Sequence, residues 1–526
     1  MASWLVSSAR SHFYVRGAYQ SLLQSFVVAP SILRHASLTS EAASASTEDS
    51  KQLGSPDELP GPNLFSSLYW ILVRGYITHT QDLQVVHKKM YGPIWKSTFG
   101  PYTNINIASA ELIEEVLRQE GKYPMRCDMA LWREHRDERG FTYGPFTEEG
   151  ERWYQLRANL NQRILKPKDA ALYTGVINEV ISDLIQKLYY IRGNSPSEVL
   201  VTDVANEFYR FAFEGICCVL FETRMGCLEK VIPSETQDFI NSIGYMLYNS
   251  VFATILPKWT RRIFPFWDRY MKGWDTMFQY GKMLVDKKME TIQARIDRGE
   301  EIQGEYLTSM LAGGKLSMKE IYGSMVELLL AGVDTTSNTL AWTLYHLAKD
   351  PKIQNSLYQE VNDVVSDRVP TTNDIARMPL LKAVIKETLR MYPVVPSNGR
   401  VPEKEVVVNG ISFPKNTLFH LCHYAVSHDE INFPEPKKFN PNRWLRDVGF
   451  KHHPFSSIPF GYGVRACVGR RIAELEMHLA LIAIMKTFEV RPGPDCENVI
   501  PVARTVLVAN KPINLLFIER QSVTSA

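Results

Sequence analysis

The sequence predicts a mainly helical protein with small β-sheets, and three observations support this class. Long segments with the apolar spacing of helices dominate the chain, the clearest of them over about residues 318–349. Signals for β-strands are few and short. No internal linker rich in proline, glycine and serine divides the 526 residues, which favours one large domain behind an N-terminal leader.

The segment 318–349 is the longest predicted helix. Ser317 and Glu320 have the spacing of a capping box at its start, and Asp350-Pro351 ends it. At about 1.5 Å per residue, such a helix would cross the whole domain. Its centre is apolar on nearly every face, so we expect it to be buried.

Shorter elements have local signals of their own. A second helix is predicted from Pro379 to a point before Pro393. The run VVVNGISF contains Asn409-Gly410, the dipeptide typical of a tight hairpin turn. Near the C-terminus, TVLVANKPINLLFIE (residues 505–519) predicts another hairpin.

Composition narrows the class of protein. The chain is 45% hydrophobic and 22% charged, as globular proteins are, and its formal net charge of +2 gives no case for nucleic-acid binding. The seven cysteines form no CxxC pair. An odd number without a framework indicates reduced thiols in a reducing compartment.

The first 40 residues have the composition of a mitochondrial targeting segment. They include nine serines and three arginines, at positions 10, 16 and 34, whereas the first acidic residue is Glu41. No apolar run in them reaches the roughly 20 residues of a membrane anchor. We therefore assign 1–35 to a transit peptide, 36–58 to a disordered linker and 59–526 to the folded domain.

One cysteine has an unusual setting, the stretch PFGYGVRACVGR that leads into an amphipathic run. Gly461, Gly463 and Gly469 allow tight or left-handed turns and close approach to a flat partner. Loop N–H groups, with the positive end of a helix beginning near Arg470, would stabilise a thiolate at Cys467. Zinc is disfavoured because no second ligand lies at suitable spacing, and a lone cysteine ligand points to haem iron. The alternative is an ordinary buried thiol.

The long helix carries a second candidate group. Ala331, Asp334 and Thr335 lie at i, i+3 and i+4, so they share one face. The small residue would leave room for a macrocycle and O2, while the acid and the hydroxyl could relay protons to a bound oxygen species. In the alternative, the threonine bonds back to its own helix and the aspartate forms a salt bridge.

Two more sets of charged side chains have helical spacing or suitable chemistry. Glu387 and Arg390 at i and i+3 can pair, with Arg443 as a third member of an ion network. Trp153 and Arg157 at i and i+4 present a ring and a guanidinium on one face. With Arg400 and Arg465 they could bind carboxylates such as haem propionates, although an exposed surface role is the alternative for each arginine.

Five motifs, in chain order WYQLR, AGVDTTS, KETLR, PNRW and FGYGVRACVG, together resemble the cytochrome P450 family. They span residues 153–469, and the resemblance covers nearly everything after residue 59. It implies an α-rich prism that holds haem b between the long central helix and the helix after the Cys loop, with O2 as co-substrate. The resemblance assigns Cys467 as the axial iron ligand, and Asp334 and Thr335 to the oxygen-activation relay.

The same resemblance assigns further residues. Those assigned to the cofactor are Trp153, Arg157, Ala331, Arg400, Phe460, Arg465, Cys467 and Gly469, and those assigned to a locking triad are Glu387, Arg390 and Arg443. Asn442 departs from the family, which more often has an acid there. A haem sensor or carrier without turnover is the alternative function, but such a protein has no use for the Asp334-Thr335 pair.

Further stretches indicate which branch of the family the chain resembles. GVRACVGRRIAELEMHL and LLKAVIKETLRMYPVVP resemble the mitochondrial branch, which receives electrons from a small acidic ferredoxin (adrenodoxin) and an NADPH-dependent reductase. Lys382 and Lys386, with Arg470 and Arg471, would form the basic docking patch for it. The alternative is an ordinary solvated basic face.

The resemblance to this branch also implies a class of substrate, and the composition of one segment indicates a contact with the membrane. Three stretches, residues 120–157, 256–274 and 328–351, resemble members that hydroxylate the terminal methyl group of sterol side chains in cholesterol and bile-acid precursors. Vitamin D3 25-hydroxylation and retinoid oxidation stay open as alternatives. The segment 256–267, LPKWTRRIFPFW, interleaves aromatic and basic residues as a segment at a membrane interface does, here the matrix side of the inner membrane. The candidate substrate residues are Met129, Trp132, Met325, Val333, and Val394 through Asn398, among them Val395 and Ser397.

Overall fold

A computed structural model describes residues 54–99, 102–126, 129–162, 164–300, 306–446 and 451–520. The predicted transit peptide and the linker up to residue 53 lie outside the described residues. Residues 54–58, which the sequence analysis placed in the linker, have a defined structure. Gly54 N donates to Gly410 O at 3.1 Å, and Ser55 caps the 3-10 turn η1 (Pro56–Glu58). The described fold therefore begins before residue 59.

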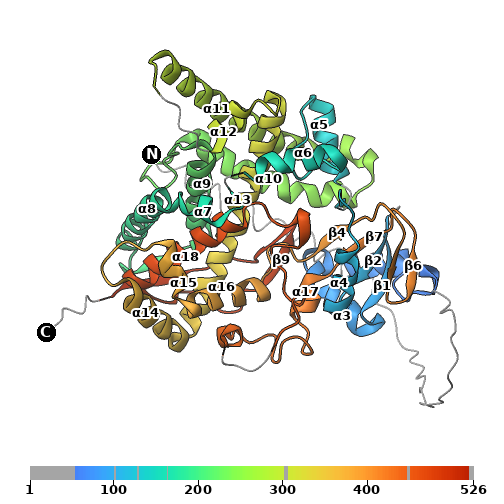
Figure 1. Ribbon diagram of the computed structural model, residues 1–526. Helices are drawn as coiled ribbons and strands as arrows, with labels where there is room; N and C mark the ends of the chain where they lie inside the picture. Colours follow the sequence, from blue (N-terminus) through green and yellow to red (C-terminus); the bar gives the residue numbers. More distant parts are fainter. Residues whose placement is uncertain are drawn as a thin grey trace.

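Helices make up most of the molecule, and the β-rich part lies at one end, on the right in Figure 1. This confirms the predicted class. The helices are α2 (Leu64–Leu68), α3 (Thr80–Tyr91), α4 (Ala110–Arg118), α5 (Ala130–Arg139), α6 (Gly150–Leu160), α7 (Pro167–Ala171), α8 (Thr174–Gly193), α9 (Val204–Phe221), α10 (Ser234–Ile255), α11 (Phe266–Asp297), α12 (Tyr306–Gly313), α13 (Met318–Lys349), α14 (Pro351–Val365), α15 (Thr372–Ala376), α16 (Pro379–Met391), α17 (His423–Ser427) and α18 (Arg470–Thr487).

The strands form small sheets. They are β1 (Ile94–Phe99), β2 (Tyr102–Ile107), β3 (Leu200–Val201), β4 (Asn398–Arg400), β5 (Val406–Val408), β6 (Ile411–Phe413), β7 (Leu418–Leu421), β8 (Phe488–Pro492), β9 (Pro501–Arg504), β10 (Val506–Ala509) and β11 (Leu515–Glu519). The largest sheet has the order β1-β2-β7-β4, in which only β2 and β7 run parallel. A second sheet has the order β3-β11-β8.

Helix α13 forms the centre of the helical part and has the predicted bounds. The capping box is present: Ser317 Oγ accepts from Glu320 N, and the Glu320 carboxylate accepts from Ser317 N at 2.9 Å. The helix packs against α9, α11, α16 and α18, and its apolar side chains belong to the main hydrophobic cluster. Burial on nearly all faces explains why its sequence lacks a polar stripe.

Two of the three shorter predictions are confirmed. Helix α16 occupies Pro379–Met391, and β5 and β6 form a hairpin with Asn409 and Gly410 at φ values of 53° and 70°. The predicted hairpin over 505–519 is wrong. Strand β10 pairs with β9 through a turn at Thr505, where φ is 68°, whereas β11 pairs with β8 and β3. The partners lie outside the segment because β11 is the central strand of its sheet, where the side chains of Leu515 and Phe517 are buried between the neighbouring elements.

Candidate active site

The Cys loop folds back on itself before α18. Gly461 and Gly463 both have a φ of 72°, in the left-handed region that favours glycine. Cys467 N donates to Phe460 O at 2.8 Å, which closes the loop. Gly469 has an ordinary φ of −85° at the N-cap of α18, so the prediction of a special backbone conformation is confirmed for the first two glycines only.

Cys467 differs from the other described cysteines in its accessibility. It keeps accessible surface, whereas the other five are buried. Burial raises the pKa of the Cys467 thiol, and the Gly469 N–H and the charge of Arg157 oppose this without cancelling it. The loop therefore acts on the thiol in the predicted direction, but the protein groups alone leave its pKa above the ordinary value.

Two arginines tie α6 to the Cys loop. Arg157 Nη2 donates to Ala466 O at 2.6 Å. Arg465 Nε donates to Pro124 O at 2.7 Å, and its guanidinium lies 3.6 Å from the ring centre of Trp153. Three residues that the sequence proposed for carboxylate binding, Trp153, Arg157 and Arg465, are thus brought together beside the loop.

This cluster has the donors and the charge to hold an anion. Trp153 Nε1 and Arg465 Nη1 are buried without a hydrogen-bond partner. Burial, with the nearby charges of Arg126 and Arg400, lowers the pKa of Arg465 to about 8. Buried cations and unpaired donors are costly unless an anion completes them. The propionate carboxylates of a haem are such anions, so the residues present fit this group.

Arg400 has a protein carboxylate as partner. Its Nε bonds to Glu120, and its Nη1 donates to Gly399 O at 2.9 Å. Burial raises the pKa of Glu120, although Arg400 and Arg465 act against it. Sequence reasoning missed Glu120 because it lies 280 positions from Arg400 with no motif around it.

Helix α13 has one short stretch with partly accessible residues. Between residues 323 and 345 every residue is buried except Ala331, Gly332 and Thr335. These three lie at i, i+1 and i+4, on one face of the helix. Ile216 of α9 packs against Gly332, where an added Cβ would lie 2.8 Å from Ile216 Cγ1. Ala331, where the sequence predicted room for a macrocycle, is thus among the few residues of this stretch that keep accessible surface.

The two polar residues of this stretch have different partners. Thr335 Oγ1 donates to Ala331 O at 2.8 Å, so the hydroxyl does bond back to its own helix and keeps its lone pairs as acceptors. Asp334 is 5% exposed, and burial raises its pKa to about 7. No ion pair in the described part of the chain includes Asp334. Its carboxyl can therefore hold or release a proton near neutral pH.

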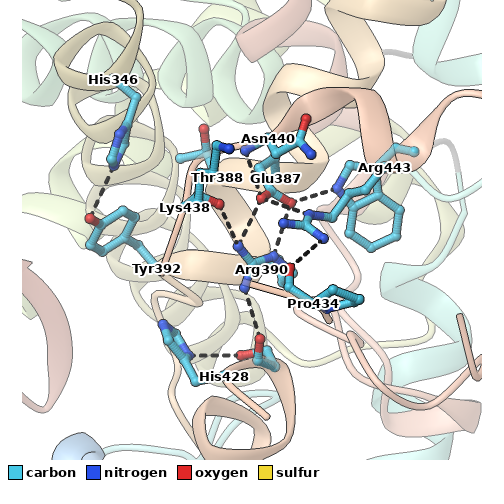
Figure 2. Close-up of polar contacts among 12 residues, drawn as sticks. His346, Glu387, Thr388, Arg390, Tyr392, His428, Pro434, Lys438, Asn440 and Arg443 are labelled. Carbon is cyan, nitrogen blue, oxygen red and sulfur yellow. Dashed lines mark hydrogen bonds and ion pairs between the residues drawn. The ribbon is translucent and has the colours of Figure 1, made fainter. Parts of the chain in front are cut away.

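The predicted triad is present (Figure 2). Both oxygens of the buried Glu387 accept from Arg390, at 2.9 and 2.8 Å, and Arg443 Nε donates to Oε1 at 3.0 Å. Burial raises the pKa of Glu387, but the two arginines outweigh it, so the pKa is lowered overall. Trp444 Nε1 and Asn440 N also donate to this carboxylate, two contacts that sequence reasoning missed.

The four predicted docking cations line one groove of about 770 Å³. Lys382 and Lys386 come from α16, and Arg470 and Arg471 come from α18. The groove also contacts the Cys loop at Phe460, Gly461 and Tyr462. Residues from two helices far apart in the sequence thus form one basic concavity beside the candidate iron ligand.

The candidate substrate residues do not behave alike. Met325 and Val333 have no accessible surface and belong to the main core cluster. Trp132 packs on Trp274 with ring centres 4.9 Å apart. Ser397 Oγ bonds with His420 Nε2 at 2.7 Å. Met129 and Asn398 are half-buried, Val394 and Pro396 are buried, and Val395 is exposed.

A buried ion pair that the sequence analysis did not predict joins α5 to α13. Arg136 Nη2 lies 3.2 Å from Glu327 Oε1, and both side chains are fully buried. Glu327 also accepts from Phe146 N at 2.7 Å and Thr147 Oγ1 at 2.8 Å. The Arg136 guanidinium lies 3.7 Å from the ring centre of Trp274 on α11. We call these contacts the Glu327 clamp; it holds the segment before α6 against the central helix.

The segment 256–267 connects α10 to α11 through the 3-10 turn η4 (Lys258–Arg262). Trp259 is 65% exposed and Phe264 is 52% exposed. Phe266 is buried, and Trp267 lies under the Arg261 guanidinium at 3.9 Å. Part of the aromatic set therefore faces outward and part packs inward. Among the described residues, no helix has the length and apolar character to cross a membrane.

Comparison with known proteins establishes the class to which this fold and site belong. The cytochrome P450 family model matches residues 59–517. The chain therefore belongs to the cytochrome P450 family, the haem-thiolate monooxygenases.

The similarity to curated relatives covers most of the chain. The mitochondrial sterol 26-hydroxylases of Homo sapiens and Rattus norvegicus are 53% and 52% identical to it, covering 88% and 90% of this chain and 89% and 91% of their own lengths. The mitochondrial 25-hydroxyvitamin D-1 alpha hydroxylase of Homo sapiens is 43% identical over 88% of this chain and 92% of its own length.

Proposed function

We propose that this protein is a mitochondrial sterol hydroxylase that oxidises the terminal methyl group of the side chain of cholesterol and of bile-acid precursors. The observation that supports this most strongly is the 53% identity to a sterol 26-hydroxylase over 88% of the chain. Vitamin D3 25-hydroxylation is a second candidate activity; the 43% identity to a 25-hydroxyvitamin D-1 alpha hydroxylase supports a vitamin D compound as substrate, although that relative is named for oxidation at another carbon.

Cys467 would ligate the iron of haem b, a group that when bound would supply the activation of O2 and the insertion of one oxygen atom into a C–H bond. Trp153, Arg157 and Arg465 would hold its propionates through the donors and charges described above. Arg400, paired with Glu120, contributes positive charge beside them. The backbone of the Cys loop orients the sulfur through the bond from Cys467 N to Phe460 O.

Two residues of α13 would transfer protons during the reaction. The Asp334 carboxyl, with a pKa of about 7, can take up and release a proton at neutral pH. Thr335 lies beside Ala331 on the same face of the helix, and its hydroxyl oxygen can accept a further hydrogen bond there.

Electron delivery belongs to the groove of α16 and α18. A small acidic ferredoxin would dock against Lys382, Lys386, Arg470 and Arg471, reduced in turn by an NADPH-dependent reductase. The exposed aromatic residues of 256–267 would contact the inner membrane from the matrix side, where the apolar sterol resides. The candidate lining residues with accessible surface, among them Ser397 and Val395, would contribute to the substrate pocket.

Reconstitution tests this function. The haem-loaded protein is combined with ferredoxin, reductase and NADPH, and kcat/KM is compared for cholesterol, a 5β-cholestane triol, vitamin D3 and retinol. We expect the highest value for the sterols, and turnover only when ferredoxin is present. A higher value for vitamin D3 or retinol would replace the sterol assignment. A variant Cys467→Ser that still shows the thiolate-type band of the reduced CO complex would overturn the haem ligand itself.

A further inference from the structure

The basic groove between α16 and α18 contains one carboxylate, and its position is unexpected. Among the residues that line the groove, Glu474 is the single acid beside the four cations. Arg470 Nε lies 2.9 Å from Glu474 Oε1, and Arg471 Nη1 lies 3.4 Å from Oε2. One carboxylate therefore pairs with both arginines that the docking surface would offer to an acidic partner.

The two lysines of the groove are arranged differently. Lys382 Nζ donates to Ala376 O at 3.0 Å, and Lys386 Nζ lies 5.8 Å from the ring centre of Trp444. No ion pair in the described part of the chain includes either lysine. The groove thus has two cations without an ion-pair partner within 4 Å and two whose charge is shared with Glu474.

The arginine pairs are exposed enough to exchange partners. The side chains of Arg470, Arg471 and Glu474 are 49%, 44% and 24% exposed. Exposed pairs of this kind are weak and are screened by salt. A carboxylate arriving from another protein can therefore replace Glu474 on either arginine at little cost.

We infer that Glu474 is an internal competitor for the acidic partner: its carboxylate occupies Arg470 and Arg471 until the partner's carboxylates displace it. This inference rests on the proposed function, because it assumes that the acidic ferredoxin docks in this groove. Lys382 and Lys386 attract the partner first, and the arginines join when Glu474 is exchanged. Because an electron carrier must leave after each delivery, a competing carboxylate speeds its release and limits its affinity.

The test uses Glu474→Gln, which removes the charge but keeps the length and the polar end of the side chain. The dissociation constant of oxidised ferredoxin is measured for the haem-loaded wild type and variant at low and high salt. We expect the variant to bind ferredoxin about three- to tenfold more tightly at low salt. This factor corresponds to the combined strength of two exposed ion pairs, which the partner no longer has to break. The gain should shrink at high salt, and kcat at saturating ferredoxin should not rise.

Glu489→Gln is the matched control. Glu489 on β8 pairs with Arg491 at 2.6 Å on an exposed surface. The 14 residues of α18 from 474 to 487 place it about 20 Å along the helix from Glu474. This variant makes the same change in net charge without freeing the groove arginines, so its affinity should stay within about twofold of the wild type.

Two results would overturn the inference: unchanged or weaker binding by Glu474→Gln, or an equal gain in both variants, which would show an effect of net charge alone. The double variant Lys382→Gln/Lys386→Gln separates this from the proposed function. If that variant binds ferredoxin as well as the wild type does, the groove is not the docking site. This result would refute the proposed electron-transfer surface itself, and not only the role of Glu474.

Discussion

At the scale of single residues, the charges that face a buried carboxyl decide its protonation. Asp334 sits in an apolar helix with no ion pair in the described part of the chain, and burial raises its pKa to about 7. Glu387 is also buried, yet its pKa is lowered because two arginines face it. The same side-chain chemistry therefore gives a proton-exchanging group in one place and a permanent anion in the other.

The raised pKa of Asp334 predicts a pH-dependent effect of Asp334→Asn on stability. Because the folded pKa of about 7 lies above the ordinary 3.8, the native state keeps a proton that the unfolded chain releases. Native stability is therefore lost as pH rises between these values, by up to about 4 kcal/mol. Asp334→Asn has no carboxyl to titrate, so its stability does not fall with pH for this reason. Its melting temperature relative to wild type should be higher at pH 8 than at pH 5, measured on the haem-loaded proteins; an equal difference at both pH values would contradict the prediction.

At the scale of elements, two buried ion networks hold helices to loops. The triad joins α16 to the segment of Asn440, Arg443 and Trp444. The Glu327 clamp joins α13 to α5 and to the segment before α6. Because α6 carries Trp153 and Arg157, the clamp also positions the cluster that fits the haem propionates.

The clamp predicts a strong effect of Glu327→Gln. Removing the carboxylate leaves the Arg136 guanidinium buried without a counter-charge, which costs about 3–5 kcal/mol of stability. We expect a lower melting temperature and faster proteolysis between α5 and α6. Arg136→Met in the same chain should recover part of the loss, because it removes the uncompensated charge.

Arg298→Gln is the control for the clamp. Arg298 forms an exposed pair with Glu300 at 2.6 Å, and such pairs contribute about 1 kcal/mol or less. If Glu327→Gln lowers the melting temperature as little as Arg298→Gln does, the buried pair is not a structural clamp.

At the scale of the whole molecule, two segments each carry several large apolar side chains that are exposed. One is the connection between α10 and α11, with Trp259, Ile263 and Phe264, and the other is α2 with the following turn, where Phe65 and Val73 are exposed. Exposed apolar clusters of this kind mark contact surfaces. Basic residues accompany the first segment, as an anionic membrane surface requires.

This surface predicts weaker membrane binding for Trp259→Ser/Phe264→Ser. Losing the two exposed rings should lower partitioning of the haem-loaded protein onto vesicles of inner-membrane composition by about tenfold. Val231→Ser/Ile431→Ser removes two exposed apolar side chains outside both segments and should leave partitioning unchanged. A co-sedimentation assay measures both, and equal losses in the two variants would contradict a specific membrane face.

The sequence by itself determined the features whose causes are local. The bounds of α13 follow from a capping box and an apolar run, the Asn409-Gly410 hairpin follows from its turn residues, and Cys467 stands out because glycines surround it. In each case the signal lies within a few residues of the feature, so no distant partner has to be known.

Only the tertiary structure decided the features that depend on distant partners. Strand β11 takes a place between β3 and β8 instead of the local hairpin, Glu120 pairs with Arg400, and Glu474 lies in a groove that α16 and α18 form together. Packing also showed that Met325 and Val333 belong to the core. These outcomes depend on which surfaces meet after folding, and burial and charge pairing across long sequence separations leave no pattern in the chain.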